Sequence, residues 1–151
     1  MKRRMVLIAC VYMAAAFLGT GDAAAQMKKG ATVWPAADVK WMEMKGGPPG
    51  IMYADLWGHV EKGAYGSLIK LPAGMNNPLH THTSDIKLIV FSGTFWYAPE
   101  GGAKVELGPG SYLLVPGGLK HTSGTGAGAP CEVFQESSGK FDLLPVSAPA
   151  K

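Results

Sequence analysis

Apolar residues in this chain come in short runs rich in β-branched and aromatic side chains, and dense turn signals separate the runs. Residues 46–50 (Gly-Gly-Pro-Pro-Gly) and 108–110 (Gly-Pro-Gly) are two of these signals. Short runs of this kind between turn residues predict β-strands. The predicted strands span residues 33–34, 39–44, 51–57, 65–71, 86–92, 94–98, 104–107, 112–115 and 131–136.

The near-even spacing of these strands predicts one all-β domain, either two packed sheets or a closed barrel. No segment after residue 25 shows a helical period over ten or more residues. The glycine-rich residues 124–130 are expected to form a flexible loop. The tail 144–151 carries two prolines and is expected to be loosely ordered. The sequence shows no second domain.

Residues 1–25 have the layout of a secretory signal peptide: a basic start, an apolar run over residues 5–19, and an Ala-Ala-Ala site ending at Ala25. The run is shorter than the roughly 20 residues that a membrane-spanning helix needs. It also continues well past Cys10, which argues against a lipoprotein signal. We therefore expect cleavage after Ala25 and a single mature domain, residues 26–151, that is periplasmic or secreted and has no membrane span.

Charge and cysteine content narrow the partners of the mature domain. The chain has 14 basic and 11 acidic residues, but three of the basic ones lie in the leader, and no arginine follows it. The remaining lysines form no basic stripe, so nucleic acid is not an expected partner. Without arginine, a planar two-pronged clamp for a carboxylate or phosphate is excluded. Cys131 is the one cysteine after the leader, and we interpret it as a small buried hydrophobe.

Three of the four histidines fall into a pattern typical of a metal site. On a strand, residues i and i+2 share a face, so His80 and His82 can point into one cavity. Neutral imidazole is the commonest protein ligand for transition metals. His59 lies outside the pattern and is interpreted as a loop or surface histidine. The two halves of the pattern are Gly74-x5-His80-x-His82 and Gly110-x5-Pro116-x-Gly118-x2-His121.

These segments resemble the two conserved motifs of the cupin superfamily, which are small β-barrel metalloproteins. The first motif, G-x5-H-x-H-x3,4-E-x6-G, ends here at Gly93, and the second has the form G-x5-P-x-G-x2-H-x3-N. Residues 92–94 and 139–142 are similar to ChrR-type cupins and related secreted single-domain cupins. The resemblance covers roughly residues 50–145 and implies a small cupin-type β-barrel, a double-sheet jelly roll, with one mononuclear metal centre.

The chain departs from the cupin pattern at the glutamate ligand, whose place falls on Ile86 or Lys87, and at the final asparagine, which is Thr125. Ile86 has the same parity as the histidines and is expected to point inward, making that side of the cavity drier. The resemblance then implies three metal ligands, His80, His82 and His121. Asp85 becomes a fourth metal ligand only if a β-bulge turns its side chain inward.

The expected cofactor is one divalent transition metal ion: iron, zinc, manganese or copper. Three neutral ligands leave coordination positions open and keep the ion's +2 charge, which favours a small anionic chelating ligand. Cupins of this kind include iron dioxygenases of diketones, thiols and dihydroxy-aromatic compounds, so a metal-dependent dioxygenase is one expectation. The alternative is a non-catalytic module that binds or senses a metal or small ligand. Both interpretations are compatible with a homodimer.

No group beyond the metal ligands is identified as catalytic by the sequence. Four side chains are candidate acids near the metal: Tyr65, Tyr97, Tyr112 and Lys87. Lys87 is also the candidate partner for the anionic end of a substrate.

Overall fold

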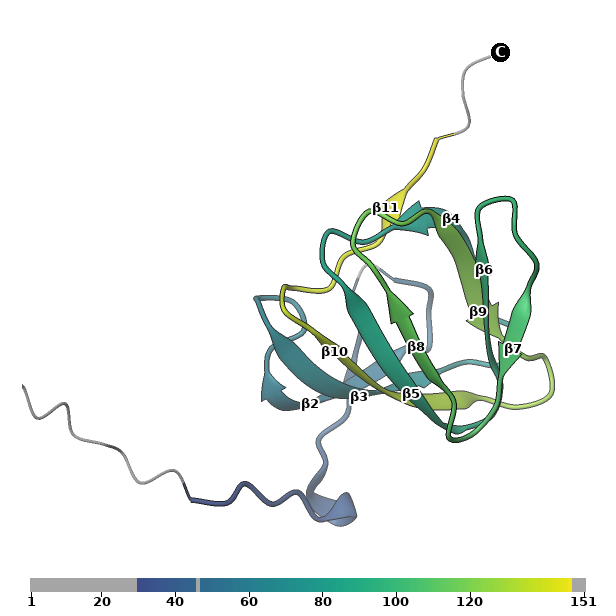
Figure 1. Ribbon diagram of the computed structural model, residues 1–151. Coiled ribbons are helices and arrows are strands. Elements are labelled where there is room, and N and C mark those ends of the chain that lie inside the picture. The colour runs from purple at the N-terminus through teal and green to yellow at the C-terminus, as the bar shows by residue number, and fades with distance from the viewer. Residues whose placement is uncertain (1–29, 46, 148–151) are drawn as a thin grey trace, which may run out of the picture. The chain divides into compact units, whose positions relative to one another are not determined.

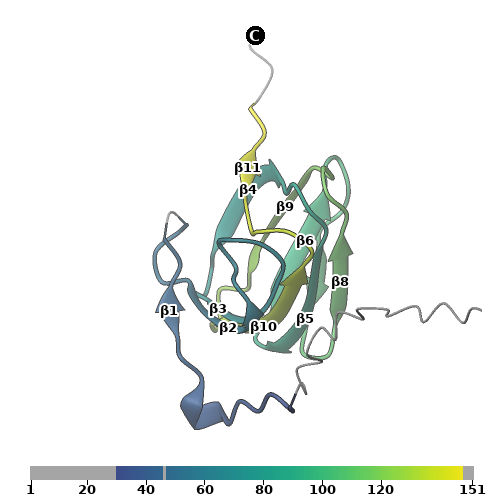
Figure 2. The same cartoon turned by 90° about the vertical axis from the view of Figure 1, so that its left-hand side faces the viewer.

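A computed structural model of the protein describes residues 30–45 and 47–147, so the predicted signal peptide lies outside the described residues. Two antiparallel sheets face one another and curve around a common interior, as Figures 1 and 2 show. The larger sheet has the strand order β1-β2-β3-β10-β5-β8, and the smaller has the order β11-β4-β9-β6-β7. The prediction of an all-β, double-sheet fold is confirmed.

The larger sheet contains β1 (Met42–Glu43), β2 (Met52–Gly58), β3 (Tyr65–Leu71), β5 (Ile86–Ser92), β8 (Tyr112–Val115) and β10 (Cys131–Ser137). The smaller contains β4 (Asn76–Thr81), β6 (Phe95–Pro99), β7 (Val105–Leu107), β9 (His121–Thr125) and β11 (Leu144–Pro145). Three strands, β3, β5 and β8, have the predicted bounds. The one helical element in the described part of the chain is the 3-10 turn η1 (Ala36–Asp38), and none there is long and apolar enough to span a membrane.

The interior of the larger sheet follows the period of two that strands impose. Along β10, Cys131, Val133, Gln135 and Ser137 are buried and the residues between them are not. Cys131 is 1% exposed, as expected for a small core residue, and burial raises the pKa of its thiol to about 11. Inward-facing residues of this sheet supply most of the apolar core.

Two strands of the smaller sheet, β4 and β9, were not predicted, because their buried positions are polar rather than apolar. Ser123 and Thr125 of β9 are each 4% exposed. Thr125, at the position of the second motif's asparagine, accepts a hydrogen bond from the amide of Met75 at 2.9 Å and donates one to the Pro72 carbonyl at 2.6 Å. A buried hydroxyl with both partners is stable in the core, so the hydrophobic pattern misses this strand.

The prediction of a loose C-terminal tail is wrong for residues 144–147. Leu144 and Pro145 form β11, which pairs with β4 opposite Thr81 and His80. The Val146 amide then donates to the Leu79 carbonyl at 3.0 Å. These backbone bonds order a segment whose own sequence has no strand signal. The predicted strand at residues 33–34 is also absent, because Val33 and Trp34 are exposed and precede η1.

Candidate metal centre

The three motif histidines meet in the interior between the sheets. His80 of β4 and His121 of β9 are direct partners in the antiparallel register, and His82 follows one residue after β4 ends. Their ring centroids lie 4.2 Å apart for His80 and His121, 5.0 Å for His80 and His82, and 5.2 Å for His82 and His121. One ring nitrogen from each lies within 4.8 Å of the other two. The side chains that sequence spacing grouped together are therefore neighbours in space.

A backbone carbonyl fixes the tautomer of each ring. The Nδ1 of His80 is 2.7 Å from the Pro78 oxygen, that of His121 is 2.9 Å from the Leu119 oxygen, and that of His82 is 2.5 Å from the Asp142 oxygen. A carbonyl oxygen can only accept, so each Nδ1 must carry the proton and donate it. In the neutral ring, Nε2 then keeps a free lone pair, and this is the atom that binds a metal.

Burial keeps these rings neutral. The histidines are 1%, 7% and 2% exposed, in chain order. Burial is the largest effect and lowers the pKa of all three, the backbone carbonyls raise it, and the neighbouring histidines lower it further. A lowered pKa favours the uncharged imidazole, which is the metal-binding form.

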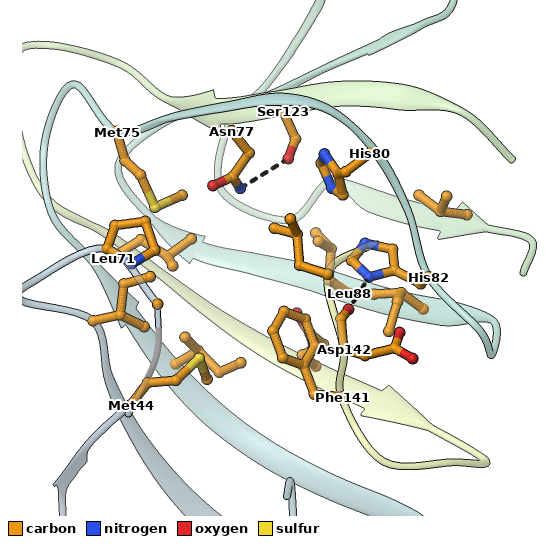
Figure 3. A pocket seen from close by; sticks show the side chains of 18 of the residues that line it. Met44, Leu71, Met75, Asn77, His80, His82, Leu88, Ser123, Phe141 and Asp142 are labelled. Atoms are coloured by element: carbon orange, nitrogen blue, oxygen red, sulfur yellow. Dashed lines mark hydrogen bonds between the residues drawn. The ribbon is translucent and has the colours of Figure 1, made fainter. Parts of the chain in front are cut away.

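The histidines line a cavity of about 430 Å³ between the two sheets. In Figure 3, His80 and His82 lie at one end of this cavity, whereas Met44, Leu71 and Met75 lie toward the other. Ile86 also lines the cavity and is 4% exposed, so its expected inward direction is confirmed. The apolar side chain thus lies in the cavity wall at the position where the resemblance implied a glutamate.

A few polar side chains interrupt this wall. Asn77 Nδ2 donates to Ser123 Oγ at 3.2 Å, and the Gln135 amide hydrogen-bonds to the Tyr65 hydroxyl. The motifs and the hydrophobic pattern did not point to Asn77, Ser123 or Gln135. Gln135 had a usable signal, because it shares the parity of the buried Cys131 and Val133 on a predicted strand.

The other sequence candidates lie elsewhere. Asp85 is exposed, and its carboxylate accepts a hydrogen bond from the Gly117 amide at 2.8 Å; in the described part of the chain, no carboxylate joins the histidine cluster. Lys87 forms an ion pair with Glu136 at 3.0 Å on the outer face of the sheet, and Tyr112 is 57% exposed. The expected roles of Lys87 and Tyr112 near the metal are therefore wrong, because Lys87 is at an outward-facing position of β5 and Tyr112 at an outward-facing position of β8. Tyr97 does lie beside His121, with ring centroids 5.3 Å apart.

The donor set fits a transition metal ion. Three neutral nitrogens suit zinc, iron, manganese and copper, and each ring is oriented by a second hydrogen bond, as metal-binding histidines usually are. The expected cofactor is therefore compatible with the geometry. His59 takes no part, since its Nδ1 accepts a hydrogen bond from the Glu61 amide at 3.2 Å.

Solved structures of similar fold include the polyketide cyclase RemF from Streptomyces resistomycificus, with a TM-score of 0.59 and 20% identity, covering 81% of this chain and 87% of that chain. A protein of unknown function with a cupin-like fold from Ralstonia eutropha has a TM-score of 0.61 and 24% identity, with coverages of 78% and 79%. A chain in the Rhodobacter sphaeroides complex of SigE with the anti-sigma ChrR has a TM-score of 0.52 and 25% identity. The match covers 68% of this chain and 51% of that chain.

No curated protein matches the sequence significantly. The family model described as the ChrR Cupin-like domain matches residues 29–137, which is most of the chain. This match agrees with the double-sheet fold and with the histidine cluster at its centre. The chain therefore belongs to the ChrR cupin-like domain family of the cupin superfamily.

Proposed function

We propose that the protein holds one divalent transition metal ion through His80, His82 and His121, and that a small chelating molecule binds at the ion's open positions. The observation that carries this proposal is the shared tautomer: three buried rings each donate Nδ1–H to a backbone carbonyl. Each therefore keeps its Nε2 lone pair within a closely spaced cluster. A metal requires neutral imidazoles whose binding nitrogens lie close together, and this arrangement supplies three of them.

The cavity indicates the kind of molecule that fits. Its volume of about 430 Å³ and its largely aliphatic wall suit a small, mainly apolar ligand. Phe141 lies 5.5 Å from His82 and Tyr97 lies 5.3 Å from His121, measured between ring centroids, so aromatic rings flank the histidines. With Lys87 outside, the metal itself is the partner for an anionic oxygen or sulfur of the ligand.

The proposed reaction is a dioxygenase reaction on this ligand. A bound iron ion would supply the open positions at which oxygen and a chelating substrate meet. Both atoms of oxygen enter the product, so the substrate supplies the electrons and no further reductant is needed. Ile86 and Leu88 keep this end of the cavity apolar, which excludes water from the reacting groups.

A non-catalytic binding or sensing role is the second candidate, and the family favours it. The matching family is named for the cupin-like domain of ChrR, and the ChrR of the Rhodobacter sphaeroides complex is an anti-sigma protein. In this role the same three histidines hold a metal or metal-bound ligand without turnover.

The experiment that separates the two candidates starts with metal analysis of the purified protein. The metal-free protein is then reconstituted with Fe(II) under anaerobic conditions and mixed with diketones, thiols or dihydroxy-aromatic compounds while oxygen consumption is recorded. Substrate-dependent consumption supports the dioxygenase. Stoichiometric Fe(II) binding with no consumption, together with a small molecule that co-purifies unchanged, supports the binding role. A protein that binds no transition metal contradicts both.

Replacing Ile86 with glutamate is expected to tighten metal binding by about tenfold or more, because a carboxylate in this wall adds an attractive charge. In the metal-free protein the same change should lower the free energy of unfolding by about 1–3 kcal/mol, since a buried acid is left without a partner. Isothermal titration and urea unfolding measure the two effects. Ile89→Glu is the matched control, because Ile89 lies on the same strand but is 39% exposed on the outer face. Equal effects of the two changes would show that Ile86 does not face the metal.

We also propose that the protein is exported and processed, on the basis of its signal-peptide-like leader. N-terminal sequencing of protein from the native host should begin at Gln26 or within a residue or two of it. Cytoplasmic protein that retains Met1 would contradict this.

A further inference from the structure

The hydrogen-bond partners of the three histidines differ in origin. His80 and His121 donate to carbonyls two residues earlier, Pro78 within β4 and Leu119 just before β9, so the neighbouring backbone supplies the partner. His82 lies beyond the end of β4 and donates to the carbonyl of Asp142, which is sixty residues away. Figure 3 shows the Asp142 carbonyl directed at the His82 ring. The family match ends at residue 137, so this partner lies outside the matched region.

The segment that carries Asp142, residues 139–146, is held by hydrogen bonds both before and after Asp142. We call this segment the C-terminal strap. The Asp142 carboxylate accepts two hydrogen bonds from Thr83, one from the amide at 2.9 Å and one from the hydroxyl at 2.5 Å. Before Asp142, the Phe141 amide donates to the Val60 carbonyl at 2.7 Å, and after it β11 pairs with β4. The Asp142 side chain thus binds the residue next to His82 while its carbonyl holds the His82 ring.

We propose that Asp142 is a positioning residue for the metal centre: by binding Thr83, it places its own carbonyl so that His82 is held as the Nδ1–H tautomer. The proposal rests on the metal-binding function proposed above. Without the carbonyl, the His82 ring can take the Nε2–H form that a free histidine side chain prefers, and this form has no lone pair on the metal-binding nitrogen. The tautomers of His80 and His121 do not depend on Asp142, because the carbonyls that hold these rings lie two residues earlier in the chain.

The first test uses metal-free protein, so it does not depend on metal binding. In protein with ¹⁵N-labelled histidine, the ¹⁵N shifts of the imidazole nitrogens report which one carries the proton. Wild-type His82 should show Nδ1–H, and Asp142→Ala should shift it toward Nε2–H while leaving His80 and His121 unchanged. Asp142→Asn should retain the wild-type pattern, because an amide can still accept from the Thr83 amide and donate to its hydroxyl.

Two further variants control for general effects. Glu136→Ala also removes a carboxylate with a side-chain partner, Lys87 at 3.0 Å, but on the outer face of the sheet, and should leave all three histidines unchanged. Thr83→Val removes the hydroxyl bond alone and should shift His82 partly toward Nε2–H. Thr83→Ser keeps a hydroxyl, so its His82 should show the wild-type Nδ1–H form. If His82 keeps Nδ1–H in Asp142→Ala, or if Asp142→Asn is as disturbed as Asp142→Ala, the proposal is overturned.

The second test measures affinity for Co(II) or Zn(II). Asp142→Ala should bind about 10–100-fold more weakly, the usual effect of losing a partner of a metal-binding histidine. Asp142→Asn should bind within a few-fold of wild type. Unchanged affinity in Asp142→Ala overturns the positioning role. If wild-type protein binds neither ion but the nitrogen shifts change as expected, the proposed function fails while the control of the His82 tautomer by Asp142 is supported.

Discussion

Replacing His82 with alanine is expected to abolish stoichiometric metal binding. The change removes one of the three clustered histidines proposed as ligands, and the nearest carboxylate in sequence, Asp85, is turned toward the Gly117 amide. Affinity should fall by more than about 100-fold, because even an outer partner of a ligand is worth about 10–100-fold. Metal analysis after dialysis and titration of metal-free protein with Zn(II) or Co(II) measure the loss.

The matched control is His59→Ala. His59 is the one histidine outside the cluster, and its Nδ1 accepts a hydrogen bond from the amide of Glu61 and lies 3.9 Å from the Asp55 carboxylate. We expect this variant to keep the metal content of the wild type. Equal losses in the two variants would mean that the site has been assigned to the wrong residues.

Replacing Gly93 with alanine is expected to destabilise the fold by about 2–4 kcal/mol, combining a disfavoured backbone conformation with a steric clash. Gly93 lies in the turn between β5 and β6 with a φ of +73°, and a Cβ there would be 2.3 Å from the carbonyl oxygen of Pro130. The backbone of a neighbouring segment cannot yield as a flexible side chain can. Urea unfolding followed by tryptophan fluorescence measures the free energy.

Gly101→Ala separates the two causes. Gly101 has a nearly identical φ of +71°, but nothing lies within 4 Å of the position that a Cβ would take. This variant should therefore lose only about 1 kcal/mol, the cost of the left-handed conformation alone. A loss as small in Gly93→Ala would show that the backbone at Pro130 can move away from this turn without cost.

Much of the architecture is determined by sequence because the information is local. Strands β3, β5 and β8 combine apolar runs with turn residues at both ends, and their bounds are predicted to the residue. The inward direction of Ile86 and its shared cavity with the histidines follow from parity and motif spacing. The inward direction of Ile86 depends on the period of two along β5, which the chain carries whatever it packs against.

Where the interior is polar, the hydrophobic pattern no longer predicts strands. The positions of β4 and β9 that line the cavity hold asparagine, histidine and serine, so neither strand was predicted although both lie inside the smaller sheet. A site that needs polar groups in the core overrides local preference at the point of function. Lys87 was a candidate for the site, although the alternation along β5 turns it outward.

The sequence by itself determined the fold class, the three histidines and the absence of a glutamate beside them. Tertiary structure alone decided which carbonyl holds the His82 ring, that Asp85 turns away, and that the C-terminal segment is ordered against β4. The physical reason is the range of the interactions. A tautomer is set by a hydrogen bond, and for His82 its partner lies sixty residues away, where no pattern along the chain can place it.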